Sequence, residues 1–300
     1  MGIDLQTNGL AAPTTRFAPS TTGYLHLGHV AHALFVWGVA RAAGGRVLIR
    51  IEDHDQSRHR PEYESAILED LAWLGFEGDA WHGQSVLNQR DRDARYHELA
   101  DHLRNGRALY ACTCSRADIL ARTGPQEGEL RYDGHCRDRG LPFSNDATWR
   151  LRLPESSVEF SDLRLGSLKQ SPWRQCGDVA IRDRHGHWTY QFAVVADDWD
   201  QGIDLVVRGE DLLESTGRQM LLAQMLGRQI APQWLHHPLL LDDTSGQKLS
   251  KRAASAAILQ RRLAGEPPEN LLGEAAWRVG LTESPRPIRA SDVPDLFRRG

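Results

Sequence analysis

The chain has 300 residues, of which 40% are hydrophobic and 25% are charged, and its formal net charge is −4. This composition is that of a folded globular protein and excludes collagen-like, disordered and coiled-coil chains. No apolar run approaches the roughly 20 residues of a membrane helix, and residues 1–13 lack the basic and apolar stretches of a secretory signal. We therefore expect a cytoplasmic protein with no membrane partner, whose four cysteines are reduced or bind metal.

Strand and helix patterns alternate through residues 1–106. Residues 15–18 form a short strand-like run, apolar residues recur at helical spacing over 27–40, and residues 46–51 are rich in β-branched side chains. Helical patterns follow at 61–74 and 90–105. This alternation predicts a parallel sheet covered by helices, of which residues 1–106 form the first half.

The pattern changes over residues 107–190, where three cysteines, more Gly and Pro, and strand-like runs replace the helical period. We expect a separate lobe inserted into the α/β domain. Alternation resumes over residues 191–252, with a strand at 203–208, a helix at 216–226 and a polar loop at 242–252. Residues 253–300 are predicted to form a short helical C-terminal segment.

The first motif with chemical content is the segment from Pro19 to His29, at the join between a predicted strand and a helix. A helix N-terminus has free backbone N–H groups and a partial positive charge, and both favour phosphate binding. Gly28 permits close approach of a ligand, and His26 and His29 lie three residues apart on one helical face. The alternative is a helix that begins with two surface histidines.

The second motif is the loop Lys248-Leu249-Ser250-Lys251-Arg252. Two lysines around a serine suit a loop that holds polyphosphate and neutralises charge in nucleotidyl transfer. A solvated basic loop is the ordinary alternative. The two motifs lie at opposite ends of one predicted α/β domain, and this arrangement favours a shared phosphate site.

Together these motifs resemble the "HIGH" and "KMSKS" signatures of class I aminoacyl-tRNA synthetases. Arg16-Phe17-Ala18-Pro19-Ser20 and Arg50-Ile51-Glu52-Asp53 are similar to glutamyl-tRNA synthetases, as are the blocks at 208–211 and 234–238. Only residues 253–300 follow the lysine loop, which is too few for an anticodon-binding domain. The chain therefore resembles the glutamyl-queuosine tRNA(Asp) synthetases, ligases that attach glutamate to the queuosine base of the tRNA(Asp) anticodon.

The resemblance implies a Rossmann-like class I catalytic domain that forms glutamyl-adenylate from L-glutamate and ATP with Mg²⁺, then transfers the glutamate to queuosine-containing tRNA(Asp). It implies no obligate protein partner. The implied catalytic residues are His26, His29 and Lys251. The implied ATP contacts are Pro19, Ser20, His26, Gly28, His29, Lys248, Ser250 and Lys251.

Charge supports the substrate side of this resemblance. Glutamate carries two carboxylates and an ammonium group, so a selective pocket needs two cationic groups and one anion, and arginine binds carboxylates bidentately. The family pattern implies glutamate contacts at Arg16, Phe17, Ala18, Pro19, Ser20, Glu52, Tyr190 and Arg208. Taken singly, Arg16 or Glu52 is more typical of a surface ion pair, but their coincidence with the other motif positions favours the binding role.

The cysteines predict one structural zinc ion. Cys112, Cys114 and Cys136 can supply three thiolates to a tetrahedral site. By ligand chemistry His135 is the first choice for the fourth position, whereas the resemblance selects Tyr132, which we adopt. The alternative is three reduced structural cysteines, and Cys176 is expected to be a packed free thiol.

Three other functions fit parts of the pattern. A compact glutamyl-tRNA synthetase would charge a tRNA 3′ end, and a nucleotidyltransferase of the same superfamily would act on a small molecule. A non-catalytic tRNA-binding module would need neither the histidines nor Lys251. The sequence assigns no individual tRNA contact and no oligomeric state.

Overall fold

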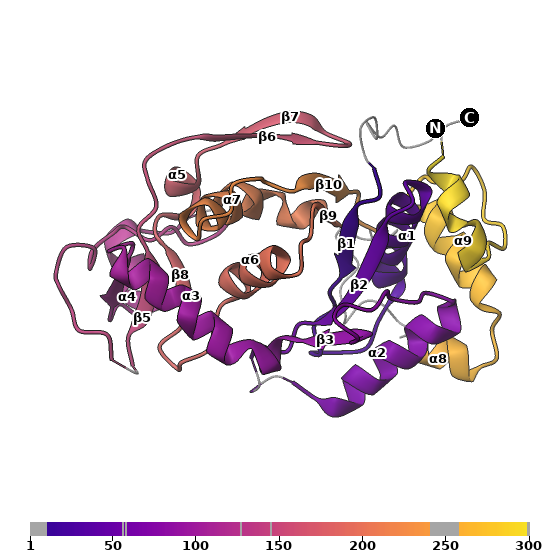
Figure 1. Cartoon of the computed structure of the whole chain (residues 1–300), viewed down its shortest axis with the longest axis horizontal. Coiled ribbons are helices and arrows are strands. Elements are labelled where there is room, and N and C mark those ends of the chain that lie inside the picture. The colour runs from indigo at the N-terminus through magenta and orange to yellow at the C-terminus, as the bar shows by residue number, and fades with distance from the viewer. Residues whose placement is uncertain are drawn as a thin grey trace.

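Parallel strands flanked by helices form the larger part of the molecule (Figure 1). The computed structural model describes residues 11–55, 57, 59–126, 128–144, 146–240 and 258–298. Its first sheet has the order β1-β2-β3, with all strands parallel. The elements of this half are β1 (Thr14–Phe17), α1 (Leu27–Ala42), β2 (Arg46–Ile51), α2 (Pro61–Leu74) and β3 (Val86–Asn88).

A second sheet, with the order β7-β6-β10-β9, lies beside the first. The backbone N–H of Asp204 donates to the carbonyl of Thr14 over 3.1 Å, so β9 runs next to β1. The strands are β6 (Val158–Asp162), β7 (Gly166–Gln170), β9 (Leu205–Gly209) and β10 (Gln233–His237). β6, β10 and β9 are parallel, and only β7 is antiparallel to its neighbour. The α/β class with a parallel sheet is therefore confirmed.

Helix α1 is buried on nearly all sides, because the strands cover one face and the C-terminal helices cover the other. The C-terminal elements on α1 are α9 (Pro268–Arg278) and the 3₁₀ turn η3 (Ala290–Leu296), while α8 (Ile258–Leu263) packs against α2. At Gly38 a Cβ atom would lie 2.1 Å from the ring of Phe297, so only glycine allows this close approach. The C-terminal segment thus completes the core around α1.

The remaining helices connect the sheets and the lobe. They are η1 (Gln89–Arg92), α3 (Asp93–Asn105), α5 (Pro172–Cys176), α6 (Tyr190–Asp200), η2 (Glu210–Ser215) and α7 (Thr216–Met225). Helix α6 lies between α3 and α7 (Figure 1), and it contacts both. No helix within the described ranges is long and apolar enough to cross a bilayer.

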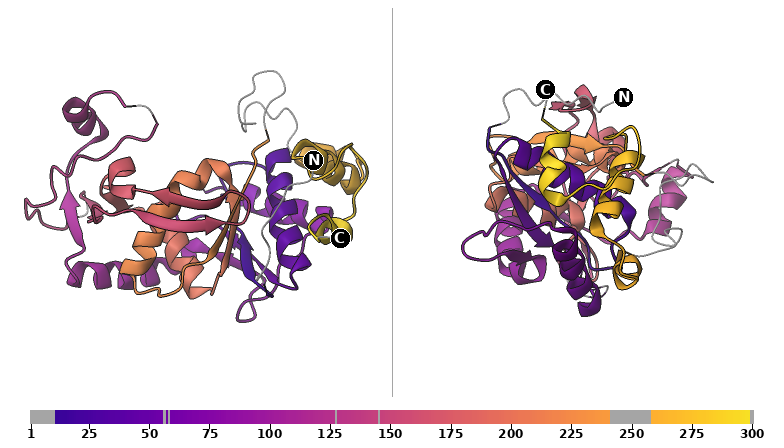
Figure 2. Two further views of the ribbon diagram at one scale, coloured as in Figure 1. Left: turned by 90° about the horizontal axis from the view of Figure 1, so that it is seen from above. Right: turned by 90° about the vertical axis from the view of Figure 1, so that its right-hand side faces the viewer.

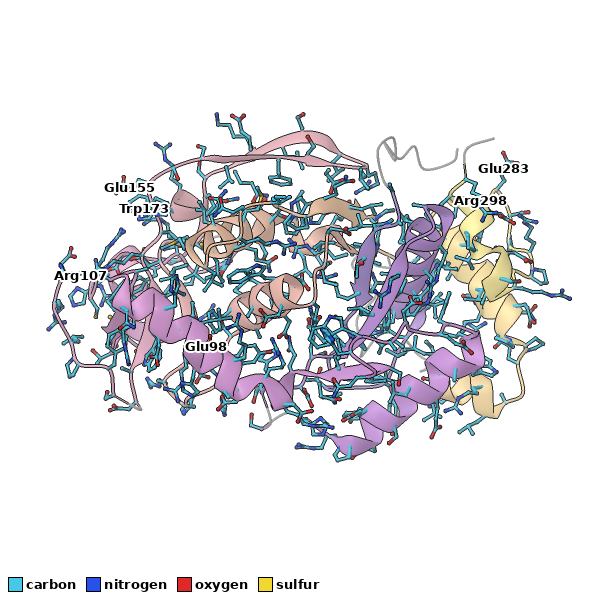
Figure 3. All side chains as sticks on the ribbon, in the orientation of Figure 1. Glu98, Arg107, Glu155, Trp173, Glu283 and Arg298 are labelled. Carbon is cyan, nitrogen blue, oxygen red and sulfur yellow. The ribbon has the colours of Figure 1, made fainter. Side chains whose placement is uncertain are left out.

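A third, antiparallel sheet forms a lobe at one end of the molecule (Figure 2). It consists of β4 (Leu109–Cys112), β5 (Thr148–Leu151) and β8 (Val179–Arg182), with α4 (Arg116–Thr123) beside it. Arg107 marks this end, whereas Glu283 and Arg298 lie at the opposite end (Figure 3). The β6–β7 hairpin differs from the expected lobe over 107–190, because β6 pairs with β10 and extends the central sheet.

Candidate active site

Two adjoining cavities open where β1 and β9 end. The large cavity, of about 510 Å³, is lined by His26, Gly28 and His29 among others. The small cavity, of about 390 Å³, is lined by Arg16, Glu52 and Tyr190 among others. The side chains that line both are Ala18, His32, Arg208 and Leu212. The connections after β1 and β9 diverge here, which is the usual position of a ligand site in an open α/β sheet.

The two motif histidines form the N-terminal cap of α1. Nδ1 of His26 accepts from the backbone N–H of Gly28, and Nδ1 of His29 accepts from the backbone N–H of His26, each over 3.1 Å. Because both Nδ1 atoms accept, each neutral ring carries its proton on Nε2. A Cβ at residue 28 would lie 2.8 Å from the His26 ring, so Gly28 is needed for this cap. Two donor groups and a helix N-terminus thus face the large cavity.

A buried ion network underlies the small cavity. Nε of Arg16 donates to Asp198 over 3.0 Å, and Nη1 of Arg50 donates to the same carboxylate over 2.7 Å. Nη2 of Arg50 lies 3.6 Å from Glu52, whose side chain is 10% exposed. Burial raises the pKa of Glu52, and the positive charge of Arg50 opposes this rise. Arg50 therefore holds the Glu52 carboxylate in place under the small cavity.

Arg208 is a buried cation whose direct hydrogen-bond partners, within the described part of the chain, are all neutral. Its guanidinium donates to His236 Nε2 over 3.0 Å, to Gln219 Oε1 over 2.6 Å and to Thr216 Oγ1 over 2.9 Å. Behind it, His236 Nδ1 lies 2.7 Å from Asp162, which requires the ring to donate there. Burial lowers the pKa of Arg208. A buried cation with neutral contacts and an open cavity beside it favours an anionic ligand.

The other predicted ligand contacts divide into three groups. Tyr190, Ala18 and Ser20 line the small cavity, and burial raises the pKa of Tyr190. Phe17 instead lies in the hydrophobic core, and neither cavity includes Pro19 in its lining. The loop residues Lys248, Ser250 and Lys251 lie outside the described residues.

The cysteine cluster lies in the lobe, near the end of β4. Sγ atoms of Cys112, Cys114 and Cys136 lie within 4.8 Å of one another, and the Cys114–Cys136 pair is 3.5 Å apart. The Tyr132 hydroxyl lies 3.3 Å from Cys112 Sγ and accepts from the backbone N–H of Cys136. His135 is exposed, and its Nε2 contacts Arg139 instead. Of the two candidates for a fourth ligand, Tyr132 is the one that lies at the thiols.

Several residues at the site were not identified from the sequence patterns. Asp198 and its neighbour Asp197 are buried in α6, and Asp197 accepts from Gln89, Arg92 and Tyr96. Two acidic residues inside an apolar helical pattern are a usable signal, since carboxylates are seldom buried without a partner. His32 carried no comparable signal, and His237 appeared only as part of the block at 234–238.

Comparison with known proteins assigns the family. The sequence model of the "tRNA synthetases class I (E and Q), catalytic domain" matches residues 13–289. The chain belongs to this family. The resemblance found from the sequence motifs is thereby confirmed, as is the assignment of the chain to the class I synthetase enzymes.

Relatives of similar length indicate which kind of synthetase within this family the chain resembles. The chain is 40% identical over 286 residues to a protein named glutamyl-Q tRNA(Asp) synthetase from Neisseria meningitidis, with 94% of this chain and 93% of the relative covered. A relative of that name from Thiobacillus denitrificans is 41% identical over 295 residues, with 95% and 96% covered.

Among solved structures, a glutamate tRNA ligase from Elizabethkingia meningosepticum, in complex with its amino acid, superposes with a TM-score of 0.75 at 26% identity. The match covers 88% of this synthetase and 60% of that ligase, so this chain spans well under two thirds of the larger protein.

Proposed function

We propose that the chain activates glutamate with ATP and transfers the glutamyl group to the queuosine base in the anticodon of tRNA(Asp). Relatives named for this activity match the chain over nearly their whole length. The structural observation that carries the proposal is Arg208, a buried cation with neutral direct partners, beside Arg16, Glu52 and Tyr190. ATP and tRNA as substrates support a cytoplasmic location.

The small cavity has the charges that glutamate requires. Arg208 and Arg16 would bind its carboxylates, with the Tyr190 hydroxyl as a further donor, and the Glu52 carboxylate would hold its ammonium group. Arg16 already shares Asp198 with Arg50, so its guanidinium is oriented before substrate binds. Such preorganisation lowers the cost of ordering the site when a ligand binds.

The large cavity suits the nucleotide. His26 and His29 would donate from Nε2 to phosphate oxygens at the start of α1, where the helix dipole adds a partial positive charge. Lys248, Ser250 and Lys251 are proposed to close on the phosphates, with Lys251 neutralising the charge of the transition state. Mg²⁺ bound to ATP neutralises further phosphate charge. The glutamate carboxylate would attack the α-phosphate where the two cavities meet, and pyrophosphate would leave.

The thiols of the lobe fit a structural zinc ion. Zinc binds thiolates at about 2.3 Å in a tetrahedron, which places sulfur atoms somewhat under 4 Å apart. The Cys114–Cys136 distance of 3.5 Å and the nearby Tyr132 hydroxyl agree with that spacing. We assign Cys112, Cys114, Cys136 and Tyr132 as the ligands, and the ion would hold the loop of residues 130–136 to β4.

Charging of a tRNA 3′ end is the second candidate, because the solved structural relatives are glutamate tRNA ligases. The position of the label on the tRNA separates the two. After transfer of radiolabelled glutamate, digestion with ribonuclease T1 yields separate anticodon and 3′-terminal fragments. We expect the label in the anticodon fragment. Label in the 3′-terminal fragment would replace this proposal with a compact charging enzyme.

A further inference from the structure

Two histidines, of which His32 is part-buried and His237 is buried, form a pair at the floor of the cavities. Nδ1 of His32, on α1, lies 3.0 Å from Nε2 of His237, at the end of β10. Aromatic rings hold both in place, since Phe17 stacks on His32 and Phe35 stacks on His237, with centroids 5.2 and 4.8 Å apart. The orientation of the pair is therefore fixed by the core of the protein.

The hydrogen bonds define where the protons lie. Nδ1 of His237 lies 2.9 Å from the carbonyl oxygen of Pro238, which can only accept, so Nδ1 of His237 carries a proton. Nε2 of the neutral His237 ring must then accept, and Nδ1–H of His32 is the donor. Nε2 of His32 is consequently an unprotonated nitrogen. Among the described residues it has no hydrogen-bond partner, and it is not among the fully buried atoms.

His32 lies where the reacting groups would meet. Of the side chains that line both cavities, only His32 and Arg208 are polar, and Arg208 is a donor. If glutamate occupies the small cavity and the nucleotide occupies the large one, the acyl–phosphate bond of the adenylate forms at this shared wall. Among the described side chains that line both cavities, Nε2 of His32 is the hydrogen-bond acceptor.

We infer that His32 is the general base of the transfer step, and this inference rests on the proposed function. Nε2 accepts the proton of the attacking hydroxyl of the tRNA acceptor while its oxygen bonds to the glutamyl carbonyl carbon. The bond from that carbon to the phosphate oxygen breaks, and AMP leaves with the electron pair. The proton on Nε2 then passes to solvent or to the phosphate of AMP, which restores the neutral pair.

The surroundings keep Nε2 unprotonated until the adenylate is present. Burial lowers the pKa of His32 well below its usual value, and His237, Arg16 from β1 and His29 from α1 lower it further. His237 in turn faces Asp211 from η2, and Arg164 and His236. The negative phosphate of the adenylate would offset the effects of burial and of the Arg16 charge, and would stabilise the imidazolium as the hydroxyl attacks.

The test separates activation from transfer. Glutamate-dependent pyrophosphate exchange measures activation, and mixing enzyme-bound glutamyl-adenylate with queuosine-containing tRNA(Asp) in a single turnover measures transfer. His32→Gln retains a side-chain donor for His237, and His102→Gln, at an exposed position on α3, is the matched control. We expect H32Q to transfer on the order of 100-fold more slowly while exchange changes little. Imidazole in the buffer should partly restore transfer in His32→Ala.

Equal losses of exchange and transfer in H32Q would overturn the base role and make His32 a structural part of the cleft. Unchanged transfer in H32Q would also overturn the base role. A wild-type chain that transfers to tRNA(Glu) and not to tRNA(Asp) would refute the proposed acceptor alone, and the same H32Q comparison on tRNA(Glu) would still decide the role of His32. Exchange by the wild-type chain without transfer to either tRNA would refute both.

Discussion

Replacement of Arg208 by Gln should separate the stability of the protein from its affinity for glutamate. In the free protein the substitution removes three hydrogen bonds to neutral groups, each worth about 1 kcal/mol. It also removes a buried charge that no carboxylate of the described residues contacts, and the desolvation of such a charge costs several kcal/mol. The two effects oppose each other, so the free energy of unfolding should change little or rise.

The affinity for glutamate, in contrast, should fall strongly in the same variant. Loss of one member of a buried, hydrogen-bonded charge pair costs about 2–5 kcal/mol, or roughly 30- to 5000-fold in affinity. The KM for glutamate in pyrophosphate exchange should therefore rise by at least about 30-fold. Glutamate at 100 times the wild-type Kd should stabilise the wild-type protein by about 2.7 kcal/mol, and the same concentration should stabilise R208Q by no more than about 0.9 kcal/mol.

Arg218 provides the matched control. It is another buried arginine of the same region, on α7, but it is already paired with Glu129 at 2.6 Å. R218Q should lower stability modestly and leave the KM for glutamate unchanged. An R208Q protein with wild-type KM would refute the assignment of Arg208 as a carboxylate-binding group.

Three further substitutions test other parts of the structure. In metal analysis of the purified protein, Cys136→Ser should contain no zinc, whereas His135→Ala should retain one zinc ion per chain. Zinc retained by Cys136→Ser and lost from His135→Ala would exclude Tyr132 as the fourth ligand. Asp198→Asn leaves two buried guanidinium groups without their shared carboxylate and should lower the free energy of urea unfolding by about 3–5 kcal/mol, whereas Glu159→Gln, at an exposed ion pair, should have no measurable effect. Burial lowers the pKa of His237 from 6.5 to about 4, so between these pH values the unfolded chain binds more protons than the folded protein, and the free energy of unfolding falls as the pH decreases. His237→Gln should remove roughly 3 kcal/mol of this fall. An unchanged dependence of the free energy of unfolding on pH between 6.5 and 4 would contradict the neutral pair.

Sequence patterns predicted residues that line the cavities best where those residues are close in the chain. The segments 16–20 and 26–29 follow one strand and begin one helix, so local rules place them at a sheet edge. The residues that hold these groups were missed because their partners are distant in sequence. Asp198 lies 182 residues from Arg16, and His237 lies 205 residues from His32.

In the lobe, too, the sequence patterns predicted local groups of residues but not contacts between distant segments. Its cysteines predicted a local cluster, and the structure brings Cys112, Cys114 and Cys136 together with Tyr132. The β6–β7 hairpin, however, joins the central sheet because β6 fits the free edge of β10, and strand-like alternation within 158–170 does not specify that partner. Pairing between distant strands had to be observed.

The identity of the acceptor distinguishes tRNA modification from tRNA charging, and transfer to matched tRNAs is its most direct test. Purified chain, ATP and radiolabelled glutamate would be combined with tRNA(Asp) containing queuosine, the same tRNA(Asp) lacking it, and tRNA(Glu). We expect label only on queuosine-containing tRNA(Asp). Label on tRNA(Glu), or equal label on both forms of tRNA(Asp), would contradict this expectation.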